Sequence, residues 1–93
     1  MRYRRSDTVA FRQLGSECLL VPIRTDPSQP MAVFRLNEVG AFLWQALDAP
    51  ATVEELGRRL ADEFEVTAAQ AKRDSAAFLE LLRGKQLIEQ VRT

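Results

Sequence analysis

Histidine is absent from this sequence of 93 residues, and cysteine occurs only once, at Cys18. Histidine is the side chain that most often acts as a general base near neutral pH and that completes the common zinc sites. Cys18 cannot form an internal disulfide, and within an apolar run we expect it to be a small buried hydrophobic residue. These absences, with the lack of a glycine-rich phosphate loop, argue against an enzyme, and we expect no catalytic residue, cofactor or metal.

The sequence also lacks net charge and long hydrophobic runs. Thirteen basic residues balance thirteen acidic ones, with no basic block that would attract a nucleic acid. The apolar runs are far shorter than the roughly 20 residues of a membrane-spanning helix, and residues 1–7 are polar, unlike a signal peptide. We therefore expect a cytoplasmic protein without nucleic-acid or membrane partners, folded as a single domain over residues 1–93.

Three segments in the first part of the chain have the character of β-strands. Residues 8–14 and 17–23 are separated by Gly15-Ser16, a connection in which glycine supplies the positive φ of a tight hairpin turn. Residues 24–30 contain two prolines and are expected to form a loop. Residues 31–36 form the third predicted strand, with Ala32, Phe34 and Leu36 on one face and Met31, Val33 and Arg35 on the other, wetter face.

Three helices are predicted after the strands, each preceded by a residue that can cap its first turn. Asn37 caps the first helix, and Thr52 with Glu55 forms a capping box before the second. Thr67 with Gln70 repeats this capping pattern before the third helix, which ends at Gly84, and residues 85–91 form a short extended tail. The predicted fold is α+β and winged-helix-like, with a three-stranded antiparallel sheet followed by three α-helices.

Several conspicuous side chains have structural interpretations that outweigh functional ones. Trp44 lies on an amphipathic helix and is expected in the core rather than at a ligand. Residues 2–5, Arg-Tyr-Arg-Arg, fit a loose terminus better than a basic arm on a phosphate backbone. The acidic side chains among residues 62–65 are expected to be solvated rather than catalytic.

The later part of the chain carries a set of residues whose order and spacing are more specific than any one of them. These residues are Leu36-Asn37, Ala41-Phe42-Leu43-Trp44, Leu47-Asp48, Thr52-Val53-Glu54-Glu55-Leu56, Leu60, Phe64, Asp74, Phe78-Leu79, Leu82 and Leu87-Ile88. Over residues 31–90 the chain resembles the PqqD-like family of small peptide chaperones, also called RiPP recognition elements because they recognise ribosomally made, modified peptides. The resemblance implies a non-catalytic domain that binds the leader of a precursor peptide and presents it to a modifying enzyme, often a radical S-adenosylmethionine (SAM) enzyme.

The resemblance also implies where the leader binds. In the family the leader is added as a strand beside the third strand, and the third helix forms the other wall of the groove. In this sequence the implied site consists of Met31, Ala32, Val33, Phe34, Arg35 and Leu36 on the strand, and of Gln70, Asp74, Ala77 and Leu81 on one flank of the helix. The opposite flank, with Lys72, Ala76 and Arg83, is the alternative wall.

The chain departs from the family pattern at three places. Asp48-Ala49-Pro50 stands where Asp-Gly is frequent, Asp74-Ser75 stands where Asp-Val is frequent, and Gln86 replaces a frequent glycine. These departures favour a modified-peptide pathway other than the synthesis of pyrroloquinoline quinone (PQQ).

Two other functions remain open from the sequence. A winged-helix DNA-binding or regulatory module has a similar outline, although the mixed charges of the third helix do not form a basic face. A homodimer that pairs through the third strand is the second alternative. The edge of that strand is otherwise either open to a peptide or covered by the chain's own tail.

Overall fold

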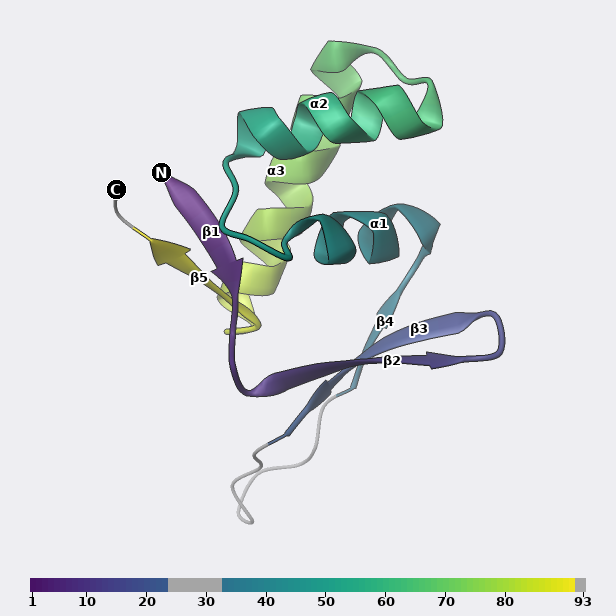
Figure 1. The fold of residues 1–93 in the computed structure, drawn as a ribbon, viewed down its shortest axis with the longest axis vertical. Coiled ribbons are helices and arrows are strands. Elements are labelled where there is room, and N and C mark those ends of the chain that lie inside the picture. Colours follow the sequence, from purple (N-terminus) through teal and green to yellow (C-terminus); the bar gives the residue numbers. More distant parts are fainter. Residues whose placement is uncertain (24–32, 92–93) are drawn as a thin grey trace.

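The computed structural model describes residues 1–23 and 33–91, and within them the chain forms two sheets and three helices (Figure 1). The elements in chain order are β1 (Arg2–Arg5), β2 (Val9–Leu14), β3 (Glu17–Pro22), β4 (Phe34–Leu36), α1 (Glu38–Ala46), α2 (Val53–Phe64), α3 (Ala68–Gly84) and β5 (Ile88–Val91). The predicted α+β class, with a three-stranded antiparallel sheet and three helices, is confirmed. The predicted loop 24–30 lies outside the described residues, as do Met31 and Ala32 of the predicted third strand. Val33 is predicted in the same strand, but β4 begins one residue later, at Phe34.

The first sheet has the order β2-β3-β4, and both of its strand pairs are antiparallel. Gly15 has a φ of 63°, so the hairpin turn uses the conformation that glycine adopts without steric cost. Leu20 and Leu36 are buried on one face of this sheet, whereas Val33 and Arg35 are exposed on the other. The expectation that the Arg35 face is the wetter one is therefore confirmed for the described residues.

The caps of the first two helices form as the sequence predicts. The Asn37 side chain accepts a hydrogen bond from the backbone N–H of Gly40 at 2.7 Å. The Thr52 hydroxyl accepts from the Glu55 N–H, and the Glu55 carboxylate accepts from the Thr52 N–H, both at 3.1 Å. These bonds hold the Glu55 carboxyl in its charged form and lower its pKa.

The third helix begins at the predicted cap, Thr67, but its capping box does not form. Thr67 accepts a hydrogen bond from the backbone N–H of Gln70 at 3.1 Å. The Gln70 side chain does not return to the cap, because its amide donates to the Asp74 carboxylate at 2.8 Å. The helix ends at Gly84, and the left-handed residue beyond it is Gln86, with a φ of 62°.

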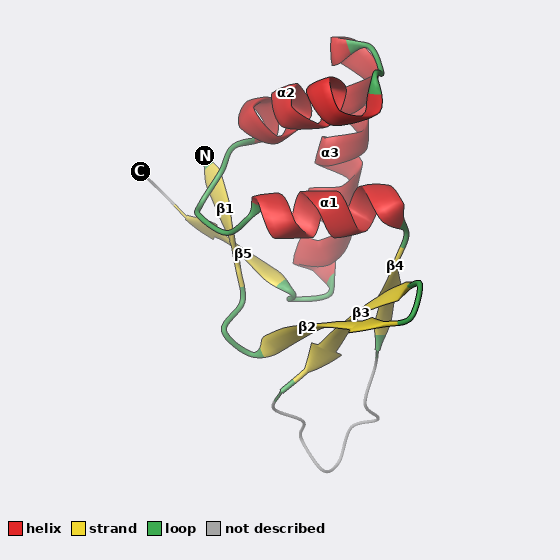
Figure 2. Cartoon of the chain, turned by 45° about the vertical axis from the view of Figure 1, so that its right-hand side comes forward, coloured by secondary structure: helices red, strands yellow, loops and turns green. Residues whose placement is uncertain are grey.

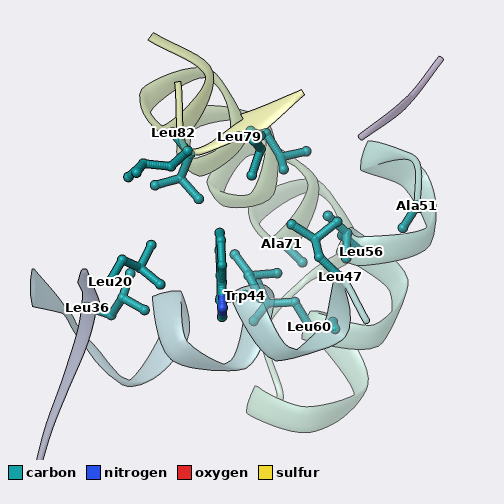
Figure 3. Packing of buried hydrophobic residues seen from close by; sticks show 14 residues of the cluster. Leu20, Leu36, Trp44, Leu47, Ala51, Leu56, Leu60, Ala71, Leu79 and Leu82 are labelled. Carbon is teal, nitrogen blue, oxygen red and sulfur yellow. The ribbon is translucent and has the colours of Figure 1, made fainter. Parts of the chain in front are cut away.

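The core is shared by the three helices, the inner face of the first sheet and the C-terminal strand (Figure 3). Trp44 is only 2% exposed and is surrounded by leucines of β3, β4, α1 and α3, which confirms its core role. Phe42 and Phe78 are half-buried rather than enclosed. Figure 2 shows the helices gathered above the first sheet, with β4 leading directly into α1.

The prediction of a loose N-terminus is wrong. Residues 2–5 form β1, which pairs antiparallel with the tail strand β5, and Tyr3 also bridges to Ala51. The Arg5 guanidinium lies 5.3 Å from the centroid of the Trp44 ring and donates to the Trp44 carbonyl oxygen at 2.6 and 3.0 Å. Burial lowers the pKa of Arg5. The basic segment is a structural strand because pairing and burial of its side chains outweigh the local preference for solvent.

No helix in the described ranges is long and apolar enough to cross a membrane.

Candidate functional site

The outer edge of β4 is the feature from which the site is built. In the order β2-β3-β4, this strand has a neighbour on one side only among the described residues. The tail strand β5 pairs with β1 and not with β4, so the alternative in which the tail covers this edge is wrong. An uncovered edge presents backbone donors and acceptors that another strand can bind.

The register of the sheet determines which residues of β4 offer these groups. The backbone N–H of Ile23 donates to the Thr8 carbonyl at 2.7 Å, so odd-numbered residues of β3 bond to β2. Along an antiparallel strand, the backbone groups of successive residues point alternately to the two neighbouring strands. The backbone groups of even-numbered β3 residues therefore bond to β4, and their partners there are Phe34 and Leu36. The N–H and C=O groups of Arg35 therefore point to the open edge, and the same alternation, continued to the residue just before β4, directs those of Val33 there.

A line of surface depressions begins beside β4 and continues between α1 and α3. The central depression, of about 320 Å³, is lined by Phe34, Arg35, Leu36, Asn37, Gly40, Phe78 and Leu81. The depression at the α1 end, of about 330 Å³, is lined by Asn37, Val39, Gly40, Leu43, Asp74, Ala77 and Phe78. The depression at the opposite end, of about 300 Å³, is lined by Pro22, Val33, Phe34, Lys85 and Leu87. We call the three together the β4–α3 groove.

Gly40 lines both the central depression and the depression at the α1 end. A Cβ atom at this position would lie 3.1 Å from the Phe78 ring and 3.3 Å from the Leu36 side chain. The glycine therefore lets the Phe78 ring lie directly against the start of α1, and it keeps the floor of the groove low.

The structure brings together most of the residues that the sequence implied for the site. Val33, Phe34, Arg35, Leu36, Asp74, Ala77 and Leu81 all line the β4–α3 groove. Gln70 lines none of its three depressions and instead binds Asp74. Met31 and Ala32 lie outside the described residues. That this set binds a peptide stays a prediction.

The sequence reasoning missed several groove residues, among them Phe78, Gly40 and Lys85. Phe78 belongs to the apolar stripe of α3, a pattern that predicts a core residue, yet its ring is half-buried and lines the groove. Gly40 has no side chain, so it does not contribute to the patterns of apolar and charged residues from which the site was predicted. Lys85 follows the predicted end of the helix, and only the fold brings its ammonium group to 5.6 Å from the centroid of the Phe34 ring.

The alternative flank of α3 faces other parts of the molecule. The Lys72 backbone lies against Gly57 of α2. The Arg83 guanidinium binds the Glu80 carboxylate at 2.6 Å, which raises the pKa of Arg83 and lowers that of Glu80. None of the three residues of this flank, Lys72, Ala76 and Arg83, lines the β4–α3 groove, whereas the flank with Asp74 and Leu81 does.

The groove is mainly apolar and carries few charges. Asp74 lines its α1 end, Lys85 lines its opposite end, and Arg35 lies between them with Glu17 at 3.9 Å. Within residues 1–23 and 33–91 no three His, Cys, Asp or Glu side chains gather in a way that could hold a metal ion. Cys18 is half-buried against the core. The arrangement fits strand binding between a sheet edge and an apolar helix flank.

Comparison with known proteins identifies a family model and similar solved structures. The family model described as coenzyme PQQ synthesis protein D (PqqD) matches residues 17–88. The structure of TbiB1 in complex with the TbiA(beta) leader peptide is 27% identical, with a TM-score of 0.78 over 97% of this chain and 99% of that one. A search of curated proteins gives no match.

Two more solved structures share the fold at lower identity. Lasso peptide synthetase B1 complexed with the leader peptide is 22% identical, with a TM-score of 0.77 over 95% of this chain and 98% of that one. The PqqD truncation of Methylobacterium extorquens PqqCD, described as a stand-alone RiPP recognition element, is 19% identical, with a TM-score of 0.74 over 96% of this chain and 89% of that one. Because the family model covers most of its length, this chain belongs to the PqqD family.

Proposed function

We propose that the protein binds the leader segment of a ribosomally made precursor peptide by adding it as a strand to β4. The observation that carries this proposal is the outward direction of the Val33 and Arg35 backbone groups beside an apolar groove. Main-chain bonds to such an edge give affinity, and side-chain pockets give specificity. Membership of the PqqD family and two similar structures solved with leader peptides support the same function.

The bound leader is presented to a modifying enzyme, and the domain itself performs no chemistry. A radical SAM enzyme is the partner that the family resemblance favours, in a cytoplasmic pathway that makes a modified peptide other than PQQ. The central apolar depression would hold a side chain of the leader, and the β4 backbone would hold its main chain.

Val33→Pro tests the strand addition. Proline removes the N–H that points to the open edge, so leader affinity should fall at least about tenfold while β4 keeps its bonds to β3. Gln13→Pro is the matched control, because Gln13 lies on the opposite edge strand and its N–H also points away from the sheet. Calorimetric titration with the synthetic leader of the cognate precursor peptide measures affinity, and circular dichroism confirms folding.

Leu81→Glu tests the helical wall of the groove. Leu81 is 48% exposed and lines the central depression, so a carboxylate there should weaken binding of an apolar leader side chain by about tenfold without unfolding the protein. Leu14→Glu, at a position 63% exposed near the hairpin turn, is the matched control. If Val33→Pro and Leu81→Glu both stay folded and bind the leader as tightly as the wild type, the proposed site is wrong.

A second copy of the chain is the other strand that could pair with β4. Light scattering over a range of protein concentrations distinguishes the two occupants. Pairing through β4 predicts a mass that rises with concentration and returns to that of the monomer when leader is added.

A further inference from the structure

The two ends of the β4–α3 groove carry opposite charges. Asp74 lines the depression at the α1 end, and Lys85 lines the depression at the other end. Among the described residues neither forms an ion pair, whereas Arg35, Arg83 and Arg4 each have a carboxylate within 4 Å. The Asp74 carboxylate accepts a hydrogen bond from the neutral Gln70 amide and Lys85 lies over the Phe34 ring, so neither charge is neutralised and both can pair with a charged peptide side chain.

The spacing of these charges matches a short piece of extended chain. Asp74 and Lys85 are eleven positions apart along α3 and its C-cap, or roughly 16 Å at the rise of an α-helix. A strand covers this distance in about four or five residues. A bound strand can thus place one side chain near each charge.

The register of β4 specifies which side chains of an added strand enter the groove. Residues opposite each other in a sheet share a face, so the peptide residues opposite Leu36 and Phe34 point toward α3. The residue opposite Leu36 meets the apolar central depression, and the residue opposite Phe34 meets Lys85. The peptide position next to Asp74 lies two residues beyond Leu36, on the α1 side.

An antiparallel added strand continues the pattern of the β2-β3-β4 sheet, in which both pairs are antiparallel. Such a strand runs from the α1 end of the groove toward Lys85. Its first groove-facing side chain then lies near Asp74, its second in the apolar depression and its third near Lys85.

Building on the proposed function, we propose that the leader recognised by this protein carries a basic, an apolar and an acidic residue at alternate positions, in that order from its N-terminal side. Asp74 and Lys85 act as specificity-determining residues for the two charged positions. Their opposite signs also set the direction of the strand, because a reversed peptide would place like charges together.

A displayed library of random peptides about twelve residues long, enough to span the groove, tests the order of charges. The wild-type protein should enrich the basic, apolar, acidic pattern at alternate positions. The charge-exchanged variant Asp74→Lys/Lys85→Glu should enrich the reverse order. An enriched peptide should bind the wild type about three- to tenfold more tightly than its counterpart with the two charges exchanged, as expected for two partly solvated ion pairs.

Three further variants assign the effect to its residues. Asp62→Lys/Lys72→Glu exchanges the same charge types at exposed positions between α2 and α3, outside the groove, and should leave the wild-type pattern unchanged. Lys85→Gln should remove only the acidic preference, and Asp74→Asn only the basic one. These single changes test the inference even if the charge-exchanged variant fails to fold.

The outcomes separate this inference from the function on which it rests. Enrichment of peptides that lose binding to Val33→Pro, but without the charge order or with the opposite order, would overturn the inference and leave strand addition intact. Equal enrichment by wild type and a folded Val33→Pro would overturn the strand-addition function and the inference together.

Discussion

The two sides of α3 differ in how closely they meet their neighbours. On the side of α2, the helices approach so closely that a Cβ on Gly57 would lie 3.1 Å from the Cα of Lys72. On the side of β4, Phe78 is half-buried and Leu81 is exposed, and a depression of about 320 Å³ lies between the helix and the strand. The same helix thus packs closely against α2 on one side and leaves an open depression beside β4 on the other.

This difference indicates how the protein combines stability with an unfilled site. Close packing between α2 and α3 buries leucine and alanine side chains, and this burial stabilises the helix position. The gap beside β4 leaves apolar surface exposed, which lowers stability unless a ligand covers it. Because α3 is held by its packing against α2, it can keep its position while the groove on its β4 side is empty.

Trp44→Ala should have the largest effect on stability, because it leaves a cavity in the core against which α3 packs. The ring is almost fully buried and also carries the Arg5 guanidinium on its face. We expect a loss of about 3–5 kcal/mol in the free energy of unfolding. Chemical denaturation measures this loss, and Phe42→Ala, at a half-buried position, should cost less. Equal costs would show that the core is centred elsewhere.

Gly57→Ala should disturb the contact between α2 and α3 without changing the β4 side of α3. The new methyl group would meet the backbone of Lys72, which cannot move as a side chain can, so α2 and α3 must separate. Overpacking of this kind, less the better helix propensity of alanine, should cost about 1–2 kcal/mol. Gly84→Ala is the matched control, because no atom lies within 4 Å of its Cβ position. Leader affinity of the folded Gly57→Ala protein should equal that of the wild type.

Ser75→Ala should stabilise the protein by making the buried face of α3 fully apolar. Ser75 is fully buried, and its hydroxyl has no hydrogen-bond partner among the described residues. Removing an unpaired buried hydroxyl should raise the free energy of unfolding by about 1 kcal/mol. Ser16→Ala, in the exposed hairpin turn, should leave it unchanged. A destabilised Ser75→Ala protein would mean that the hydroxyl is satisfied after all.

The sequence predicted the elements whose signals are local. The cap at Asn37, the capping box at Thr52 and the turn at Gly15 each act within a few residues, and each forms as expected. The third helix shows the limit of this reasoning, because Gln70 binds Asp74 and not the cap. At Gln86 the sequence departs from a frequent glycine, and the fold still imposes a left-handed conformation there.

From β2 onward the sequence by itself determined the order of the elements, their boundaries to within a few residues and the apolar face of each helix, since these follow from periodicity and from bonds between near neighbours. Only the tertiary structure decided that residues 2–5 form a strand, because their partner β5 lies more than eighty positions away along the chain. It also decided which flank of α3 faces β4 and that Lys85 reaches the groove. These features depend on contacts between distant segments, and no local pattern in the sequence encodes them.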